Sequence, residues 1–579
     1  MNLPDLAEFM TWPWEKIAPY YDELRKATLT ADSVKGWLAD WSRLGEYLHE
    51  TASRLHVAVT VDTTDEEAHQ RFEAFIEGVL PEARKAEQAL AKKLVESGLE
   101  PEGFCVPLRN MRAEIELFRE ENLPLQVEEE KLRNAYNQVV GAQTVEWHYK
   151  EYTVSQMRPF LQEPDRTVRE EAWRLMTERQ LRDRGPLTRI WQQMLDLRQQ
   201  MAANADKPDY RAFRWQQMGR FDYTPDDCRA FHKAIEEVVV PAAAAVLEKR
   251  RQRLGLDRLR PWDLNVDPAG RPPLRPFRNV EELKEKSEAI FHHVDPQLGA
   301  YYHTMREENL LDLENRKGKA PGGYCTAFPV SKRPFIFMNA VGVHDDVQTM
   351  FHESGHAFHV FESLALPYLY HQGNVPMEFA EVASMSMELL ASPYLTHDFG
   401  GFYTPHEAAR ARIEHLERSL LFWPYMAVVD AFQHWVYEHP EEAHDPAECD
   451  RIWGGLWDRF MPVTDWRGLE DAKVSGWMRK LHIFQYPFYY VEYGLAQLGA
   501  VQVWANALED QQAAVAAYRK ALALGGTVTL PELYAAAGAK FAMDAATLRK
   551  AVDLMMRVIE ELETVAEGGA KGLGLGVQS

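Results

Sequence analysis

Residues 352–356 of the chain read His-Glu-Ser-Gly-His. Two histidines four residues apart lie on the same face of an α-helix, so both imidazoles can reach one metal ion. The glutamate between them is turned toward a water at that ion and can accept its proton. The stretch therefore predicts a helix that binds one Zn²⁺ per chain through His352 and His356, with Glu353 beside it. The competing interpretation is two histidines placed on a helix by chance.

A third metal ligand has to come from a different helix. His359 lies two helical turns, about 10.5 Å, from His352, which is too far for one tetrahedral ion to bind both. Residues 377–390 predict a second, largely apolar helix that carries three glutamates, Glu378, Glu381 and Glu388. Carboxylates on an apolar helix need a partner, and a metal ion with its histidines supplies one. The alternative is that they are surface residues of an amphipathic helix.

The residues before the histidine motif predict a hairpin followed by the metal-binding helix. Two short runs rich in aromatic and apolar residues, separated by a proline-containing turn, are expected to pair as an antiparallel hairpin over about 324–339. The helix is predicted over about 346–363, with a capping box formed by Asp345 and Gln348 at its start. The hairpin should therefore lie directly beside the histidines.

The rest of the chain predicts helices joined by turns, so the fold class is mainly α. Amphipathic, charge-rich segments fill the first two hundred residues, and after a proline-rich loop at 261–276 the helical pattern resumes up to Arg316. It resumes again after the hairpin. We divide the chain into an N-terminal helical region (1–200), a helical catalytic domain (201–567) and a flexible tail (568–579).

Composition indicates a globular protein of the cytoplasm. The 579 residues include 65 Lys and Arg against 88 Asp and Glu, and the net charge of −23 disfavours nucleic-acid partners. Hydrophobic residues make up 46% of the chain, enough for a large core. No apolar stretch approaches the roughly 20 residues of a membrane span. The four cysteines lie far apart and no secretory signal is found, so we expect a reducing compartment and no membrane partner.

Two segments together resemble a known family. His-Glu-Ser-Gly-His-Ala-Phe-His at 352–359 and Glu-Phe-Ala-Glu-Val-Ala-Ser at 378–384 look like the thimet oligopeptidase and oligoendopeptidase F family of zinc metallopeptidases. Residues 153–172 and 318–339 are similar to the N-terminal helices and the hairpin of its oligoendopeptidase F branch. The resemblance implies a multi-helical, zincin-type metallopeptidase with a small antiparallel sheet beside the active-site helix and a deep substrate channel.

The resemblance also implies roles for single residues. Carried over position by position, it makes Glu381 the third zinc ligand beside His352 and His356. It makes Glu353 the general base, and Glu388 a partner that holds one of the ligands in place. Zn²⁺ is therefore the expected cofactor.

Residues 482–493, His-Ile-Phe-Gln-Tyr-Pro-Phe-Tyr-Tyr-Val-Glu-Tyr, are similar to the family's segment that lines the cleft opposite the zinc helix. The spacing of Tyr486, Tyr490 and Tyr493 fits one helical face. The resemblance implies that Tyr493, Tyr486 and His482 stabilise the transition state and that Tyr490 contacts substrate. The proline in this segment stands where wider family members have glycine, which leaves the matching of the tyrosines open by one residue. The alternative is an aromatic stripe of the core.

The hairpin and the motif together predict a function. Gly322, Gly323 and Tyr324 are expected to bind an extended peptide by strand addition, because glycine allows close backbone approach. The predicted enzyme is a zinc metalloendopeptidase that hydrolyses internal bonds of short unstructured peptides with a zinc-activated water. One alternative is a helical metallocarboxypeptidase, which would need a free substrate C-terminus. Another is a non-catalytic helical binding protein with a relict site. Cleavage preference and oligomeric state are not predicted.

Overall fold

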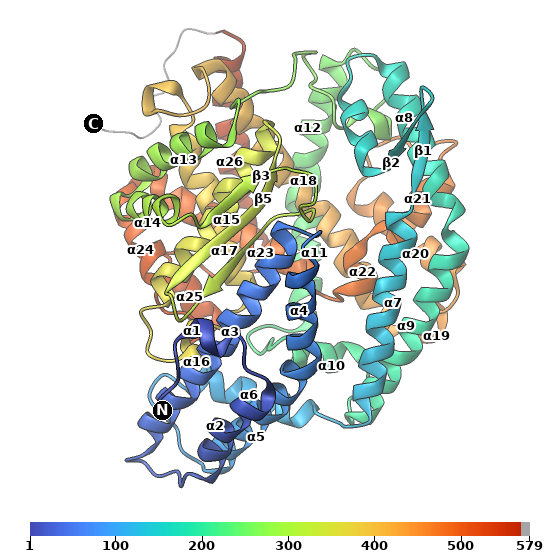
Figure 1. The fold of residues 1–579 in the computed structure, drawn as a ribbon. Coiled ribbons are helices and arrows are strands. Elements are labelled where there is room, and N and C mark those ends of the chain that lie inside the picture. The colour runs from blue at the N-terminus through green and yellow to red at the C-terminus, as the bar shows by residue number, and fades with distance from the viewer. Residues whose placement is uncertain (569–579) are drawn as a thin grey trace.

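The computed structural model describes residues 1–568, which fold into helices around two small sheets (Figure 1). The mainly α fold predicted from the sequence is confirmed. Except for Gly568, the predicted tail at 568–579 lies outside the described residues. Within residues 1–568, no helix combines the length and the apolar character needed to cross a bilayer.

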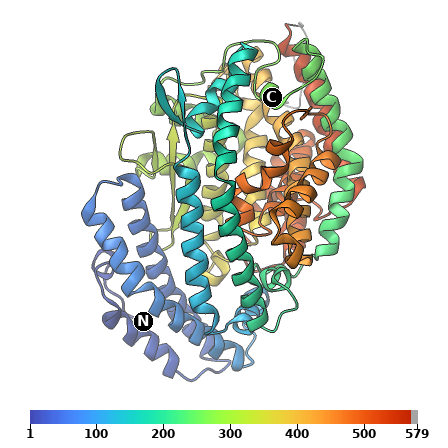
Figure 2. The same ribbon diagram turned by 90° about the vertical axis from the view of Figure 1, so that its right-hand side faces the viewer.

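The first six helices form one end of the molecule, drawn in blue in Figures 1 and 2. They share an apolar core of their own that includes Trp37, Trp41 and Leu90. Helix α3 extends from this end to contact strand β4. The six helices are α1 Leu6–Phe9, α2 Trp14–Lys26, α3 Val34–Val61, α4 Glu66–Gly78, α5 Leu80–Glu96 and α6 Cys105–Leu117.

Two long helices, α7 (Asn122–Gly141) and α9 (Arg184–Asn204), lie side by side next to this end (Figure 2). Between them in sequence come a 3₁₀ helix, Ser155–Gln162, and helix α8, Arg166–Arg182. Helix α9 continues through residue 200, so a domain boundary there would cut a helix. The division into residues 1–200 and 201–567 stays a prediction.

The expectation of helices alone in the first two hundred residues is wrong at one place. Strands β1 (Thr144–Trp147) and β2 (Lys150–Thr153) form an antiparallel hairpin. Its two turn residues, His148 and Tyr149, both have positive φ, which reverses the chain tightly. Alternation in β1 buries two apolar side chains on one face, and this period-2 pattern is too short to stand out among helical segments.

Five further helices lead from α9 to the second sheet. A π-helical turn, Ile235–Val239, joins α11 to α12, and a 3₁₀ helix, Pro261–Asp263, opens the loop predicted at 261–276. The five helices are α10 Tyr210–Gln217, α11 Pro225–Ala234, α12 Val240–Arg253, α13 Val280–Val294 and α14 Pro296–Glu307.

The second sheet confirms the predicted hairpin and adds a strand. Strands β4 (Tyr324–Phe328) and β5 (Arg333–Ala340) pair antiparallel, with Cys325 opposite Ile336. Strand β3 (Leu311–Glu314) pairs parallel with β5, so the order is β3-β5-β4. Strand β4 is therefore an edge strand.

The helical pattern expected up to Arg316 is consequently wrong over its last residues. Helix α14 ends at Glu307, and Asn309 has a φ of +55°, a left-handed conformation that stops a helix. Leu311 and Leu313 then alternate with polar residues and are buried, as expected of a strand with one face on the core.

Helices α15 (His344–Ser363) and α17 (Met377–Ala391) agree closely with the two helices predicted for metal binding. They pack against each other behind the second sheet (Figure 1). At their crossing a Cβ on Gly355 would lie only 2.5 Å from the carbonyl oxygen of Ala383. The glycine inside the histidine motif therefore permits the close approach of the two helices.

The predicted cap of α15 is wrong by two residues, because the N-cap residue is Val343 and not Asp345. Asp346 accepts the backbone N–H groups of Val341, Gly342 and Val343 at 2.8, 2.8 and 3.0 Å. Asp345 pairs instead with Arg418 on the surface. These three N–H groups precede the first helical residue, so the buried Asp346 side chain reaches back and fixes the turn by which the chain enters α15.

The remaining helices follow α15 in the sequence, and some of them cover α17. Helix α17 packs against α23, and α18 packs against α23 and α26. Short 3₁₀ helices lie at Ser392–Tyr394, His397–Phe399 and Ser475–Arg479. The α-helices are α16 Leu369–Gln372, α18 Pro405–Glu438, α19 Pro440–Ala443, α20 Pro446–Phe460, α21 Glu470–Val474, α22 Leu481–Gln485, α23 Tyr490–Glu509, α24 Gln511–Leu522, α25 Leu530–Ala536 and α26 Ala545–Ala566.

Candidate active site

Helices α15 and α17 bring three of the predicted residues to one point. Nε2 of His352 lies 3.3 Å from Oε2 of Glu381, and Nε2 of His356 lies 3.8 Å from the same oxygen. Ligand atoms of all three residues lie within 4.8 Å of one another. Two imidazoles and one carboxylate are a donor set that suits Zn²⁺ and leaves a fourth position open. The donor set therefore fits the expected metal.

Glu388 holds one of these histidines in place. Its Oε1 accepts from Nδ1 of His352 at 2.7 Å, which leaves Nε2 of that ring free to bind a metal. Its Oε2 accepts from Nε2 of His415, on α18, at 2.8 Å. His415 was not predicted, because it lies outside any motif. Burial raises the pKa of Glu388, but the two imidazole hydrogen bonds outweigh it and lower that pKa to about 2.

The protonation states of the two histidines also suit the binding of a cation. Burial and the neighbouring His352 lower the pKa of His356 to about 4, so its ring is neutral and can act as a ligand. Burial also opposes protonation of His352, but hydrogen bonds to Glu381 and Glu388 outweigh it and raise its pKa. The two carboxylates thus attract a positive charge to the ring, and a metal ion can replace the proton there.

Glu353 lies between the two histidines on α15 and is only 8% exposed. Burial, reinforced by the negative charges of Glu381 and Glu388, raises its pKa to about 7. A backbone hydrogen bond from Cys325 in strand β4 acts in the opposite direction. The carboxylate therefore stands between the histidine motif and the edge strand of the sheet.

A wall of aromatic residues faces this point. The ring of His482 lies 4.9 Å from Tyr490 and 6.2 Å from Tyr493, measured between centroids. The hydroxyl of Tyr489 lies 3.5 Å from Oε1 of Glu381. Tyr489 was not among the predicted site residues, although it lies in the segment 482–493, where the matching of the tyrosines was open by one residue.

The expectation that three tyrosines share one helical face is wrong for the first of them. Helix α22 ends at Gln485 and α23 begins at Tyr490, so Tyr486 lies in the connection between two helices. Its side chain is 45% exposed. Phe488, with a φ of +64°, marks the turn that breaks the helical spacing.

Three of the four predicted substrate-binding residues, Gly322, Gly323 and Tyr324, lie where strand β4 begins, whereas the fourth, Tyr490, belongs to the aromatic wall. Gly322 has a φ of +102°, which only glycine adopts without strain. Gly323 lies against the backbone of β5. The Tyr324 side chain is already engaged within the protein, because its ring stacks on Phe337 and its hydroxyl lies 2.6 Å from Oγ1 of Thr60.

Glu378 does not join the metal-binding group. It is buried, accepts a hydrogen bond from Tyr223 at 2.6 Å and lies 3.7 Å from the guanidinium of Arg220. Glu378 thus belongs to a buried ion pair. The alternative of a surface residue on an amphipathic helix would have left its carboxylate in solvent.

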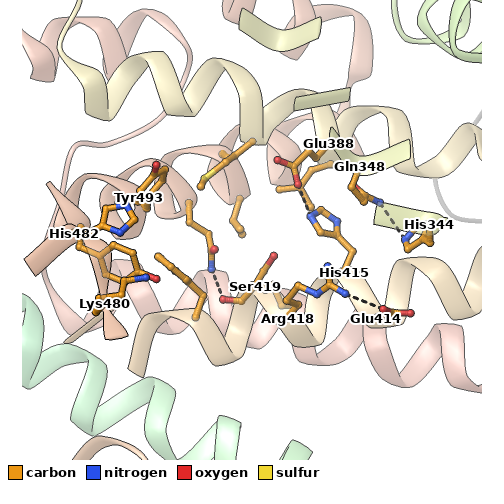
Figure 3. A pocket seen from close by; sticks show the side chains of 18 residues that line it. His344, Gln348, Glu388, Glu414, His415, Arg418, Ser419, Lys480, His482 and Tyr493 are labelled. Carbon is orange, nitrogen blue, oxygen red and sulfur yellow. Dashed lines mark hydrogen bonds and ion pairs between the residues drawn. The ribbon is translucent and has the colours of Figure 1, made fainter. Parts of the chain in front are cut away.

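A cavity of about 400 Å³ adjoins the site and extends between α15, α17, α18, α23 and α26. Figure 3 shows His482, Tyr493 and Lys480 at one end and Glu388, His415 and His344 at the other. Apolar side chains form much of the wall between these ends: Met385, Leu389, Phe422, Ala500, Val501 and Met555. Its lining includes the carboxylate that positions His352 and part of the aromatic wall.

Comparisons with known proteins match this arrangement. The family model described as Peptidase family M3 matches residues 160–553, and the Peptidase M3 N-terminal domain matches residues 7–103. Oligoendopeptidase F (chromosomal) of Lactococcus lactis subsp. cremoris is 35% identical over 83 residues, which cover 14% of this chain and 13% of that protein. Oligopeptidase PepF of Bacillus subtilis is 26% identical over 243 residues, or 40% and 34% of the two chains. These alignments thus span about a third or less of the curated relatives.

The likeness of the folds extends over nearly the whole chain. The structure of PZ peptidase A with an inhibitor superposes with a TM-score of 0.85 and 27% identity, covering 95% of this chain and 98% of the other. The family model alone spans more than half of the sequence, including the histidine motif and the aromatic wall. By sequence and by fold, this chain belongs to peptidase family M3, in the oligoendopeptidase F branch.

Proposed function

We propose that the chain is a zinc-dependent oligoendopeptidase that hydrolyses internal bonds of short unstructured peptides. The observation that carries this proposal is the convergence of His352, His356 and Glu381 beside the buried carboxylate of Glu353. Membership of a peptidase family supports the class of reaction.

The site residues divide the chemistry between them. A bound Zn²⁺ would act as a Lewis acid toward the scissile carbonyl and would acidify a water. Glu353 accepts the proton of the attacking water and then delivers it to the amine that leaves. Its raised pKa suits both steps, because a base near neutrality can also act as an acid.

The aromatic wall supplies hydrogen-bond donors for the charge that develops on the carbonyl oxygen. Burial raises the pKa of Tyr493 to about 12, so its hydroxyl keeps its proton at neutral pH and can donate it in a hydrogen bond. Burial and the neighbouring Lys480 lower the pKa of His482 to about 4, so its ring is neutral. Tyr489, whose hydroxyl lies 3.5 Å from Glu381, is a further candidate. Donors placed before the reaction stabilise the transition state more than the substrate.

The sheet offers a place for the peptide backbone. Strand β4 is an edge strand, and its Cys325 already faces Glu353. An extended peptide that pairs with β4 would pass over the histidine motif, with main-chain hydrogen bonds giving affinity for many side-chain sequences. Most of the backbone of a folded protein is already hydrogen-bonded within that protein, which favours short unstructured substrates.

Hydrolysis of a blocked peptide tests this function against the alternatives. An N-acylated, C-amidated, internally quenched peptide should be cleaved at an internal bond, and a chelator should stop the cleavage until zinc is added back. A metallocarboxypeptidase would cleave only the unblocked form. A binding protein with a relict site would cleave neither form.

A further inference from the structure

Lys480 stands out in the cavity beside the site. It follows the 3₁₀ helix Ser475–Arg479 and precedes α22, so its side chain projects from a junction toward α18 and α23. Its ammonium nitrogen lies 3.8 Å from the ring centre of Tyr490 and 5.2 Å from that of Tyr425. Figure 3 shows it at the end of the cavity formed by His482 and Tyr493.

No anion balances this charge within residues 1–568. The Lys480 ammonium makes no ion pair with a carboxylate and no hydrogen bond to a side chain or carbonyl there. An ammonium has three N–H donors, and the two aromatic faces can satisfy only part of its need for negative potential. Burial alone lowers its pKa to about 8, so the side chain is still mostly charged at neutral pH.

The other charged groups that line the cavity are compensated. Glu388 is paired with His352 and His415. Glu414 lies 2.9 Å from Arg418, which also pairs with a surface aspartate.

The remaining cavity histidines carry no charge at neutral pH. Burial lowers the pKa of both His344 and His482 to about 4, so both rings are neutral. Lys480 is therefore the uncompensated charge of the cavity lining described above, and that charge is positive.

The cavity joins this ammonium to an apolar wall and to the candidate active site. Its volume of about 400 Å³ falls in the range of sites that bind small ligands or side chains. A carboxylate that entered would meet an ammonium with no carboxylate partner in a partly desolvated setting, where charge-assisted hydrogen bonds are strong. We propose that Lys480 binds a carboxylate of the peptide substrate, either the C-terminal carboxylate or an Asp or Glu side chain. This inference rests on the proposed peptidase function.

The net charge of the whole chain favours the opposite substrate preference. A net charge of −23 repels acidic peptides at long range and favours basic ones. A local preference for a carboxylate would therefore come from the cavity and not from the average surface. It would appear at one substrate position and would be weakly dependent on the charge of the rest of the peptide.

Matched peptides test the inference. A blocked, internally quenched peptide is made in a series in which Glu moves one position at a time, each with a Gln partner at the same position. A second pair has a free or an amidated C-terminus. At one position, or at the terminus, the wild type should prefer the charged member in kcat/KM by roughly 10- to 100-fold, as expected for a charge-assisted hydrogen bond. The position identifies which carboxylate is bound.

Variants of the lysine assign that preference. Lys480→Met keeps a long apolar side chain on Tyr490, and should abolish the ratio between charged and neutral peptides while the melting temperature stays close to that of the wild type. Lys480→Arg should keep part of the preference for the charged peptide. Lys473→Met is the control, because Lys473 pairs with Asp458 and does not line the cavity. It should leave the ratio unchanged.

The outcomes separate the inference from the function on which it rests. If the wild type cleaves the peptides but no charged member is preferred, or if the preference survives Lys480→Met, the inference is wrong and Lys480 only packs on the aromatic rings. If Lys480→Met slows all peptides equally, the same conclusion holds. If no peptide is cleaved in the presence of zinc, the proposed function fails and the inference fails with it.

Discussion

Replacing Glu388 by Gln should weaken zinc binding although Glu388 is not itself a predicted ligand. The carboxylate accepts one hydrogen bond from His352 at 2.7 Å and one from His415 at 2.8 Å. A glutamine of the same shape has one acceptor oxygen and no charge. It can keep the bond to His352, but its NH₂ group then faces the N–H of His415.

The expected size of the effect follows from these two bonds. A hydrogen bond to a charged group contributes about 1.5–3 kcal/mol and a neutral one about 0.5–1.5 kcal/mol. Loss of charge at the bond to His352 therefore costs about 1–1.5 kcal/mol of zinc-binding free energy. That corresponds to an affinity roughly 10-fold lower, at the lower end of the 10- to 100-fold effects known for residues that support ligands. Glu388→Ala removes both bonds and should cost more.

Competition with a chromophoric chelator measures this change at fixed pH. The control is Glu414→Gln, because Glu414 lines the same cavity but is 43% exposed and pairs with Arg418 near the surface. Exposed pairs contribute little, so this variant should bind zinc as the wild type does. The reasoning is refuted if Glu388→Gln binds zinc within twofold of the wild type while its circular dichroism spectrum is unchanged.

Two further predictions concern the third ligand and the aromatic wall. Glu381→Ala should reduce zinc content sharply in metal analysis. Glu378→Ala should lower the melting temperature and leave zinc bound, because Glu378 is held in a separate buried ion pair. If Glu378→Ala lost more zinc than Glu381→Ala, the third ligand would have to be Glu378. Tyr493→Phe should lower kcat by roughly 10- to 1,000-fold at unchanged zinc content. Tyr486→Phe, a change at an exposed connection, should have little effect on kcat. A kcat of Tyr493→Phe as close to the wild type as that expected for Tyr486→Phe would exclude Tyr493 from stabilising the transition state.

The sequence predicts the parts of this fold that repeat or follow a motif. Helical periodicity is strong in α15 and α17, and the motif spacing places His352 and His356 on one face, as the structure has them. Gly355 shows why the motif also determines packing, since any larger residue would separate the two helices. These features depend on local spacing and can be read along the chain.

The features that sequence analysis missed depend on distant contacts or on single backbone angles. His415 reaches Glu388 only because the fold brings α18 and α17 to the same cavity, and no spacing rule connects residues on separate helices. The positive φ of Phe488 breaks the spacing that placed Tyr486 on a helical face, and a non-glycine residue in that conformation gives no signal in the sequence. Strand β3 has four residues, too few for its alternation to be told from a helix.

The setting of Lys480 also depends on contacts between residues that are distant in sequence. Its surroundings are two tyrosines from different helices and a cavity with no carboxylate partner for it within residues 1–568, and neither can be predicted from the residues next to it in sequence. Its charge is visible in the sequence, but the missing counter-charge is visible only in the fold.

The Glu353→Gln variant tests the central claim most directly, with zinc content and hydrolysis of a blocked peptide measured on the same sample. Gln keeps the shape of the side chain and leaves His352, His356 and Glu381 in place, but it cannot accept the proton of a water. We predict one zinc ion per chain in both proteins and loss of most of the wild-type turnover in the variant. A variant that has lost its zinc, or one that cleaves the peptide at a rate close to the wild type, would contradict the account.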